Sequence, residues 1–213
     1  MIIDERLVTY INSLDTGNTD ILDTIEKEAL DTYVPIIRKE MQGFLKLLLA
    51  MKRPARILEV GTAVGFSAIL MAEYDPVECE ITTIENYEKR IPIARENFKR
   101  AGKEHQITLL EGDATEILKE LTKPYDFIFM DAAKGQYIHF MPDILRLLKP
   151  EGLLVSDNVL QDGDIIESHF IVTRRNRTIH KRMREYLYAL THSEELVTSI
   201  LPIGDGVTVS VRK

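Results

Sequence analysis

The sequence contains one cysteine, no tryptophan and no long uninterrupted run of apolar residues. The single cysteine, Cys79, excludes an internal disulfide and a cluster of thiolate metal ligands. No apolar run approaches the roughly 18 residues that a membrane-spanning helix requires. The first residues also lack the basic start and long apolar centre of a signal peptide. We therefore expect a cytoplasmic protein with no membrane partner.

Basic side chains are in the minority, since 34 acidic residues outnumber 27 basic ones and give a formal net charge of −7. This balance argues against nonspecific binding of nucleic acid over the whole surface. The segment from Arg174 to Arg184 is the exception, because it is rich in basic residues and contains no acidic one. Hydrophobic residues make up 45% of the 213 residues, which is typical of a folded globular protein. We expect a single domain over residues 1–213.

From residue 55 onward, short runs rich in β-branched residues alternate with amphipathic stretches. This alternation predicts an α/β fold in which helices connect parallel strands. The predicted strands are 55–60, 81–85, 107–111, 125–131 and 152–156. The predicted helices between and after them are 65–74, 87–101, 114–122 and 137–149.

The two ends of the chain follow other patterns. Residues 195–202 and 207–211 predict an antiparallel hairpin around a Gly-Asp-Gly turn. Residues 1–50 are predicted to form a helical extension that packs on the sheet. Its candidate apolar faces contain Leu7, Ile11 and Leu14 and, further along, Phe44, Leu45, Leu48 and Leu49.

The first candidate site is the loop from Glu59 to Gly65, which follows the first predicted strand. Glycines let backbone N–H groups approach a ligand closely, and a helix start favours a carboxylate. The spacing is Gly-x-x-x-Gly rather than the Gly-x-Gly-x-x-Gly of dinucleotide-binding enzymes. This difference favours S-adenosylmethionine as the ligand.

Acidic residues end the next two predicted strands. Glu85 is placed to bind ribose hydroxyls, and Asp113 is placed to accept a hydrogen bond from an adenine amino group. Each residue alone has an ordinary alternative, which is a solvated acid or a helix cap. Their recurrence at successive strand ends favours a cofactor site, because open α/β sheets bind ligands there.

Oxygen-bearing side chains end the last two predicted parallel strands. Asp131 follows the fourth strand, and Asp157 and Asn158 follow the fifth. Two carboxylates and an amide oxygen form a ligand set that suits Mg²⁺. The alternative is that Asp157 and Asn158 form a turn and that Asp131 caps a helix. Convergence beside the predicted cofactor favours the metal site.

Lys134 lies three residues after Asp131, within reach of the same site. It is a candidate general base that removes a hydroxyl proton, and the alternative is an exposed surface lysine. A bound cation would orient and acidify a substrate hydroxyl. These features predict a substrate with two adjacent oxygens.

Taken together, the motifs resemble the cation-dependent O-methyltransferases that include catechol and caffeoyl-coenzyme A enzymes. The resemblance covers nearly the whole chain, from Glu-Val-Gly-Thr-x-x-Gly-x-Ser through Gly-Asp-Ala, Asp-Ala-x-Lys and Asp-Asn to Pro-Ile-Gly-Asp-Gly. It implies a homodimer with a Rossmann-like class I methyltransferase fold: a seven-stranded, mostly parallel sheet with an antiparallel C-terminal hairpin and N-terminal helices. The ligands of Mg²⁺ or Mn²⁺ that it implies are Asp131, Asp157 and Asn158, and the catalytic base is Lys134. The S-adenosylmethionine contacts that it implies are Ile37, Glu59, Gly61, Ser67, Glu85, Asp113, Ala114 and Asp131.

Within that family the chain most resembles the bacterial branch that methylates 5-hydroxyuridine at the tRNA wobble position to give 5-methoxyuridine. The 5-hydroxyl and the 4-carbonyl are neighbours and can chelate one cation, and a tRNA anticodon loop presents an accessible base. If the basic segment forms a helix, one face is an apolar stripe of Ile179, Met183, Leu187 and Leu190. The opposite face, which we expect to contact phosphates, contains Arg174, Arg177, Lys181 and Arg184. The alternatives are a solvated amphipathic helix and, for the whole protein, a small-molecule catechol-type O-methyltransferase.

Overall fold

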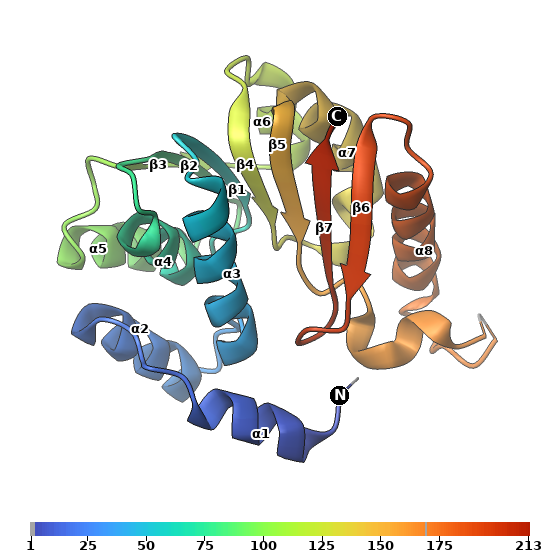
Figure 1. Cartoon of the computed structure of the whole chain (residues 1–213), viewed down its shortest axis with the longest axis horizontal. Coiled ribbons are helices and arrows are strands. Elements are labelled where there is room, and N and C mark those ends of the chain that lie inside the picture. The colour runs from blue at the N-terminus through green and yellow to red at the C-terminus, as the bar shows by residue number, and fades with distance from the viewer. Residues whose placement is uncertain (1–2, 169) are drawn as a thin grey trace.

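The computed structural model describes residues 3–168 and 170–213. The first two residues of the predicted helical extension, Met1 and Ile2, lie outside the described residues. A seven-stranded sheet forms the centre, in the order β3-β2-β1-β4-β5-β7-β6 (Figure 1). The strands are β1 (Arg56–Val60), β2 (Glu80–Glu85), β3 (Ile107–Glu111), β4 (Tyr125–Met130), β5 (Leu148–Ser156), β6 (Leu196–Leu201) and β7 (Val207–Arg212).

Strands β1 to β5 pair with one another in parallel, whereas β7 pairs antiparallel with both β5 and β6. The order reverses at β1, which lies between β2 and β4. In open α/β sheets a ligand binds at such a switch point, outside the carboxyl ends of the strands. The predicted fold class, a mostly parallel sheet with an antiparallel C-terminal hairpin, is confirmed.

Helices cover both faces of the sheet (Figure 1). One layer consists of α2 (Asp20–Asp31), α3 (Lys39–Lys52), α4 (Phe66–Tyr74) and α5 (Ile91–Arg100), and the other of α6 (Ala114–Glu120), α7 (Tyr137–Leu147) and α8 (Arg177–Thr191). Successive strand residues point to opposite layers: Ile57 packs toward α3 and α4, and Leu58 packs toward α7. Both faces of the central strands β1 and β4 are therefore buried, which explains their nearly continuous apolar sequences.

Two predicted helix boundaries are wrong. The helix predicted from residue 87 begins at Ile91, because the backbone N–H groups of Asn86 and Tyr87 donate to the Glu85 carboxylate and hold a turn there. The helix predicted to end at 149 ends at Leu147. Strand β5 begins at the next residue, four positions earlier than predicted, since Leu148 already pairs with β4.

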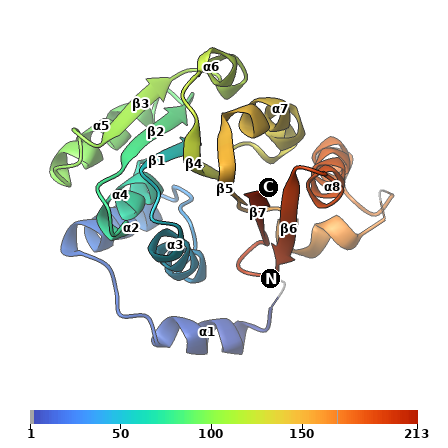
Figure 2. The ribbon, with the colours of Figure 1, turned by 45° about the horizontal axis from the view of Figure 1, so that its top comes forward.

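The N-terminal extension packs only in part as predicted. Helix α3 buries Leu45 and Leu49 in the core, but α1 (Glu5–Ser13) has no buried residue. Figure 2 shows α1 set apart from the sheet. The prediction that Leu7, Ile11 and Leu14 pack on the sheet is wrong, because all three are more than half exposed. In the residues that the structure describes, no helix has the length and apolar character needed to cross a membrane.

Candidate active site

The carboxyl ends of β1 to β5 open into a cavity of about 940 Å³. This volume is near the upper end of the range for small-molecule sites. Most of the residues predicted from sequence line it: Ile37, Gly61, Ser67, Glu85, Asp113, Ala114, Asp131, Lys134, Asp157 and Asn158. The structure thus brings the predicted cofactor residues and the predicted metal ligands to one place.

Gly61 forms the turn between β1 and the glycine loop. Its φ is +93°, and a Cβ at this position would lie 2.4 Å from the backbone oxygen of Asp131. Only glycine combines this backbone conformation with such a close approach. The residue therefore lets the ends of β1 and β4 meet, so that the cofactor loop lies directly beside Asp131.

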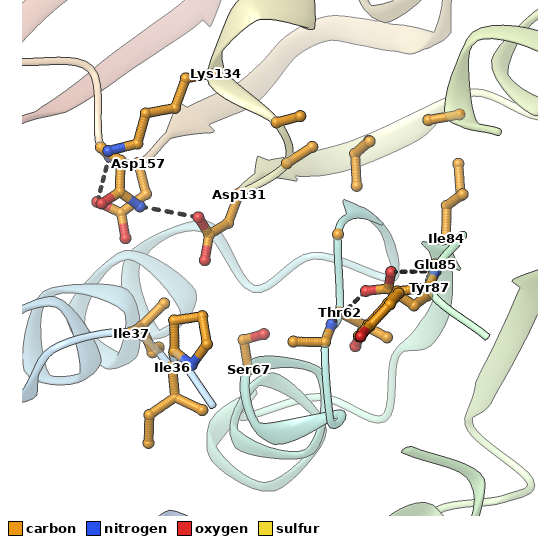
Figure 3. Close-up of a pocket in the computed structure, with 18 of the residues that line it drawn as sticks. Ile36, Ile37, Thr62, Ser67, Ile84, Glu85, Tyr87, Asp131, Lys134 and Asp157 are labelled. Atoms are coloured by element: carbon orange, nitrogen blue, oxygen red, sulfur yellow. Dashed lines mark hydrogen bonds between the residues drawn. The ribbon is translucent and has the colours of Figure 1, made fainter. Parts of the chain in front are cut away.

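Glu85 has a fixed orientation in the wall of the cavity. One carboxylate oxygen accepts a hydrogen bond of 2.7 Å from the backbone N–H of Ala63. The other oxygen accepts from the N–H groups of Asn86 at 3.0 Å and Tyr87 at 2.8 Å. Figure 3 shows Glu85 beside Thr62 and Tyr87. A carboxylate oriented in this way retains acceptor capacity for the hydroxyls of a ribose.

Asp113 has the helix-cap role that the sequence offered as an alternative, and its predicted adenine contact stays a prediction. It is the N-cap of α6, and its carboxylate accepts a hydrogen bond of 2.8 Å from the backbone N–H of Thr115. That hydrogen bond lowers the pKa of Asp113. Asp113 and Ala114 also line the cavity, so the helix cap lies where an adenine ring could be recognised.

Glu59 is not part of the cavity lining, and its predicted direct contact with the cofactor is not confirmed. It is fully buried, and its two oxygens accept hydrogen bonds from the hydroxyls of Ser67 and Thr83. Burial raises the pKa of Glu59 to about 7, although these hydrogen bonds act in the opposite direction. Its role in this structure is to fix Ser67, which does line the cavity.

The predicted metal ligands lie together at the ends of β4 and β5. The side-chain amide of Asn158 donates to Asp131 at 2.9 Å, and its backbone N–H donates to the Asp157 carboxylate at 2.7 Å. Asn158 adopts a left-handed backbone with φ of 62°, which asparagine tolerates better than most residues. Figure 3 shows Asp131 and Asp157 at the same end of the cavity.

The chemistry of these side chains fits a hard divalent cation. Burial raises the pKa of Asp131 and of Asp157, and the neighbouring Asp131 charge raises that of Asp157 further. Two buried carboxylates in this proximity repel each other, and a bound cation would offset that repulsion. Over residues 3–168 and 170–213, no three His, Cys, Asp or Glu side chains converge on a common point. The third protein ligand would therefore be the amide oxygen of Asn158.

Lys134 begins a short turn, Lys134–Gln136, between β4 and α7. The residue is half-buried and lines the cavity, unlike the exposed lysine of the alternative interpretation. Figure 3 shows its side chain extending toward Asp157. Its positive charge lowers the pKa of Asp131 and Asp157, against the larger effect of burial. The amine is therefore placed beside the predicted cation ligands.

The sequence interpretation assigned no site role to Arg38 or Asp205, which also line the cavity. Arg38 forms ion pairs with Asp205 at 2.5 Å and with Asp162 at 3.3 Å. Asp205 belongs to the Gly-Asp-Gly turn, which predicted a hairpin but gave no indication that the hairpin end reaches the cavity. For Arg38 there was no signal, since its partners are far away in the sequence.

The basic segment differs from the predicted helix face. Arg174 is exposed but precedes α8, which begins at Arg177. Lys181 is also exposed. The guanidinium groups of Arg177 and Arg184 donate to backbone carbonyls of the preceding loop, including those of Val172 and Ile165. The predicted phosphate contacts of these four residues stay a prediction.

The apolar face of α8 is rotated relative to the predicted stripe, and it buries His180, Met183, Tyr186 and Leu190. Arg182 contacts the cavity wall indirectly, because its guanidinium donates to the backbone carbonyl of Gly135 at 3.2 Å. Helix α8 therefore packs against the turn that contains Lys134.

Comparison with known proteins shows the family of the chain. Residues 12–213 match the model of the O-methyltransferase family. A catechol O-methyltransferase from Niastella koreensis is 34% identical over 171 residues, covering 78% of this chain and 77% of the relative. A caffeoyl-CoA O-methyltransferase from Medicago sativa is 31% identical over 180 residues, covering 79% and 71%. The SAH-bound Podospora anserina methyltransferase PaMTH1 has a TM-score of 0.87 at 28% identity, covering 98% of this chain and 94% of that one.

The fold and the cavity define a methyltransferase with its site at the carboxyl edge of a mixed sheet. The match over nearly the whole chain then gives the family: this protein belongs to the O-methyltransferase family.

Proposed function

We propose that this protein transfers a methyl group from S-adenosylmethionine to a hydroxyl oxygen with the help of a divalent cation. The observation that carries the proposal is the convergence of an oriented Glu85, the Asp131-Asp157-Asn158 group and Lys134 in one cavity. The ribose would lie at Glu85, the adenine at Asp113 and Ala114, and the methionine near Gly61, Ser67 and Ile37. In that arrangement the sulfonium methyl would face the end of the cavity that contains Asp131.

The oxygen ligands of Asp131, Asp157 and Asn158 would hold Mg²⁺ or Mn²⁺. When bound, the cation supplies Lewis acidity and a common anchor for two neighbouring substrate oxygens. Lys134, with its amine unprotonated, would accept the hydroxyl proton at its Nζ atom. The bound cofactor would supply the methyl group: the substrate oxygen would form a bond to the methyl carbon as the sulfonium S–C bond breaks, with S-adenosylhomocysteine as the leaving group that keeps the electron pair.

For the substrate we propose 5-hydroxyuridine at the wobble position of tRNA. Its 5-hydroxyl and 4-carbonyl are adjacent oxygens that can share one cation, and an anticodon loop can present the base unpaired. Support comes from exposed cations on the element that contacts the Lys134 turn. Helix α8 packs against that turn, and Arg174, Arg175 and Lys181 are exposed at or before its N-terminal half, with Lys181 in an exposed ion pair with Glu185 at 3.7 Å. These cations are available to phosphates of a loop whose base enters the cavity.

A second candidate function is methylation of a small catechol. It is favoured by the 34% identity to the Niastella koreensis catechol O-methyltransferase. A catechol offers the same pair of adjacent oxygens and needs no contact with the basic residues. The two candidates therefore share the chemistry at Asp131, Asp157 and Lys134 and differ in what binds outside the cavity.

The test is methyl transfer from labelled S-adenosylmethionine to tRNA that carries 5-hydroxyuridine, with a catechol in a parallel reaction. Each reaction is run with Mg²⁺ and with a chelator, and tRNA that lacks the 5-hydroxyl serves as the matched control. We expect label in the hydroxylated tRNA only, and only with the cation. Efficient labelling of the catechol alone would favour the catechol as the substrate over the tRNA. Labelling in the presence of the chelator would refute the requirement for a cation.

A further inference from the structure

Tyr137 lies behind the two predicted cation ligands and is completely buried. Its hydroxyl is 3.1 Å from the backbone oxygen of Met130 and 3.1 Å from the backbone oxygen of Asp157. Met130 is the last residue of β4 and directly precedes Asp131. One hydroxyl thus contacts the backbone at or next to the residues that carry both carboxylates, Asp131 and Asp157.

The same tyrosine also fixes the turn that contains Lys134. Tyr137 begins α7, immediately after the Lys134–Gln136 turn. Its position is therefore coupled through the chain to that of Lys134, three residues earlier. A single side chain connects the ends of β4 and β5 and the start of α7, which together provide Asp131, Asp157 and Lys134.

A second buried tyrosine holds the ring of Tyr137 from behind. The ring of Tyr186 in α8 meets it edge to face, with centroids 5.4 Å apart and planes at 79°. The Tyr186 hydroxyl does not contact the two carbonyls; it is paired with the Ser156 hydroxyl at 2.7 Å and also contacts the Met130 sulfur at 3.9 Å. The ring packing and the hydroxyl contacts of Tyr137 can therefore be separated experimentally.

We propose that Tyr137 is a positioning residue whose hydroxyl sets the spacing of Asp131 and Asp157 and thereby the affinity for the divalent cation. The inference rests on the cation site of the proposed function. Groups that orient metal ligands without touching the metal typically contribute about 10- to 100-fold in metal affinity. A hydroxyl has only one proton, so Tyr137 donates to one carbonyl at a time or shares the proton between both. Either arrangement resists separation of the two strand ends.

The test compares Tyr137→Phe with Tyr186→Phe in the full-length protein. Each change removes one buried hydroxyl and retains the aromatic ring, so the two variants are matched in chemistry and in packing. Binding of Mn²⁺ and of S-adenosylhomocysteine is measured separately by titration calorimetry. We expect Tyr137→Phe to weaken Mn²⁺ binding by about tenfold, with S-adenosylhomocysteine affinity unchanged, and Tyr186→Phe to retain Mn²⁺ affinity within about twofold. Turnover by Tyr137→Phe should recover when Mn²⁺ is raised to saturation.

Three results would overturn the inference. Unchanged Mn²⁺ affinity in Tyr137→Phe would remove the positioning role, and an equal loss in both variants would assign the effect to general destabilisation. Loss of turnover that saturating Mn²⁺ does not restore would place the defect elsewhere in the site. A wild-type protein that does not bind Mn²⁺ would refute the proposed cation site itself, and this outcome is distinct from failure of the tyrosine variant alone.

Discussion

Two parts of the site differ in their buried acids. One is the proposed cofactor half, at the ends of β1 to β3, and the other is the proposed acceptor half, at the ends of β4 and β5. In the cofactor half Glu59 is sealed from the cavity and both of its oxygens receive hydroxyl hydrogen bonds. In the acceptor half Asp131 and Asp157 line the cavity. Burial raises the pKa of all three acids.

This difference separates structural acids from acids available to a ligand. Glu59 has its partners within the protein, so its protonation is a matter of fold stability. Asp131 and Asp157 are held side by side, and their mutual repulsion is a cost that a cation can offset. The acceptor half is therefore built less favourably for folding and better suited to binding, a pattern common in active sites.

The largest expected effect comes from removing an acid of the acceptor half. Asp157→Ala should reduce methyl transfer by about a thousandfold or more, since a metal Lewis acid contributes several kcal/mol to catalysis. Cation dependence should disappear with the activity. Because burial disfavours the charged form of Asp157, the unfolding temperature of the ligand-free variant at pH 7 should be unchanged or higher. A fully active variant that ignores chelators would contradict the assignment.

The second-largest expected effect comes from Lys134, the basic residue of the acceptor half. Lys134→Met removes the amine and retains much of the aliphatic chain, and we expect turnover to fall by roughly a hundredfold or more. Binding of S-adenosylhomocysteine, which depends on the other half, should be unchanged in calorimetry. Wild-type rates of single-turnover methylation would exclude Lys134 as the base.

In the cofactor half, the corresponding change is Glu59→Gln, and its expected effect is on stability. Because the folded-state pKa of about 7 lies above the usual value of 4.5, the folded protein binds a proton more tightly than the unfolded chain. The resulting contribution to the free energy of unfolding is fully present below about pH 4.5 and is lost as the pH rises through about 7. It amounts to roughly 3 kcal/mol, since one pKa unit corresponds to about 1.4 kcal/mol.

The measurement is urea unfolding of wild type and Glu59→Gln across this pH range. The wild-type free energy of unfolding should fall more steeply with pH than that of the variant. Parallel profiles for the two proteins would show that Glu59 does not titrate in this window.

The smallest expected effect comes from the exposed basic residues outside both halves of the cavity. Replacing the exposed residues Arg174, Arg175 and Lys181 with serine should flatten the salt dependence of RNA binding by about 0.7 per lost phosphate contact. Arg177 and Arg184 are left intact, because they hold the backbone of the preceding loop. The matched control removes three exposed lysines elsewhere in the chain, with Lys27→Ser, Lys99→Ser and Lys123→Ser. An equal change in the control, or loss of activity on a catechol, would count against an RNA-contacting surface.

The sequence predicted those features that depend on strand ends. Gly61 and Asp157 each follow a strand and Glu85 ends another, and parallel strands bring such positions to one edge. The sequence did not predict which partners the side chains near the strand ends contact. Glu59 was predicted to touch the cofactor because its position in the motif does not reveal that Ser67 and Thr83 occupy both of its oxygens.

Other features depend on tertiary contacts between distant segments. Arg38 and Asp205 meet across 167 positions of sequence, and neither residue type predicts the other as a partner. Helix α1 has the amphipathic pattern of a packed helix, yet its apolar side chains are exposed. Periodicity predicts which face of a helix is apolar, but not what covers that face.

The most direct test of the account is a crystal structure of the protein with S-adenosylhomocysteine and Mn²⁺, using the anomalous signal of manganese. We predict a manganese peak bounded by Asp131, Asp157 and Asn158, with the cofactor along the ends of β1 to β3 and its sulfur toward that peak. Manganese bound elsewhere, or a cofactor that occupies the acceptor half, would contradict the division of the cavity on which the proposed function depends.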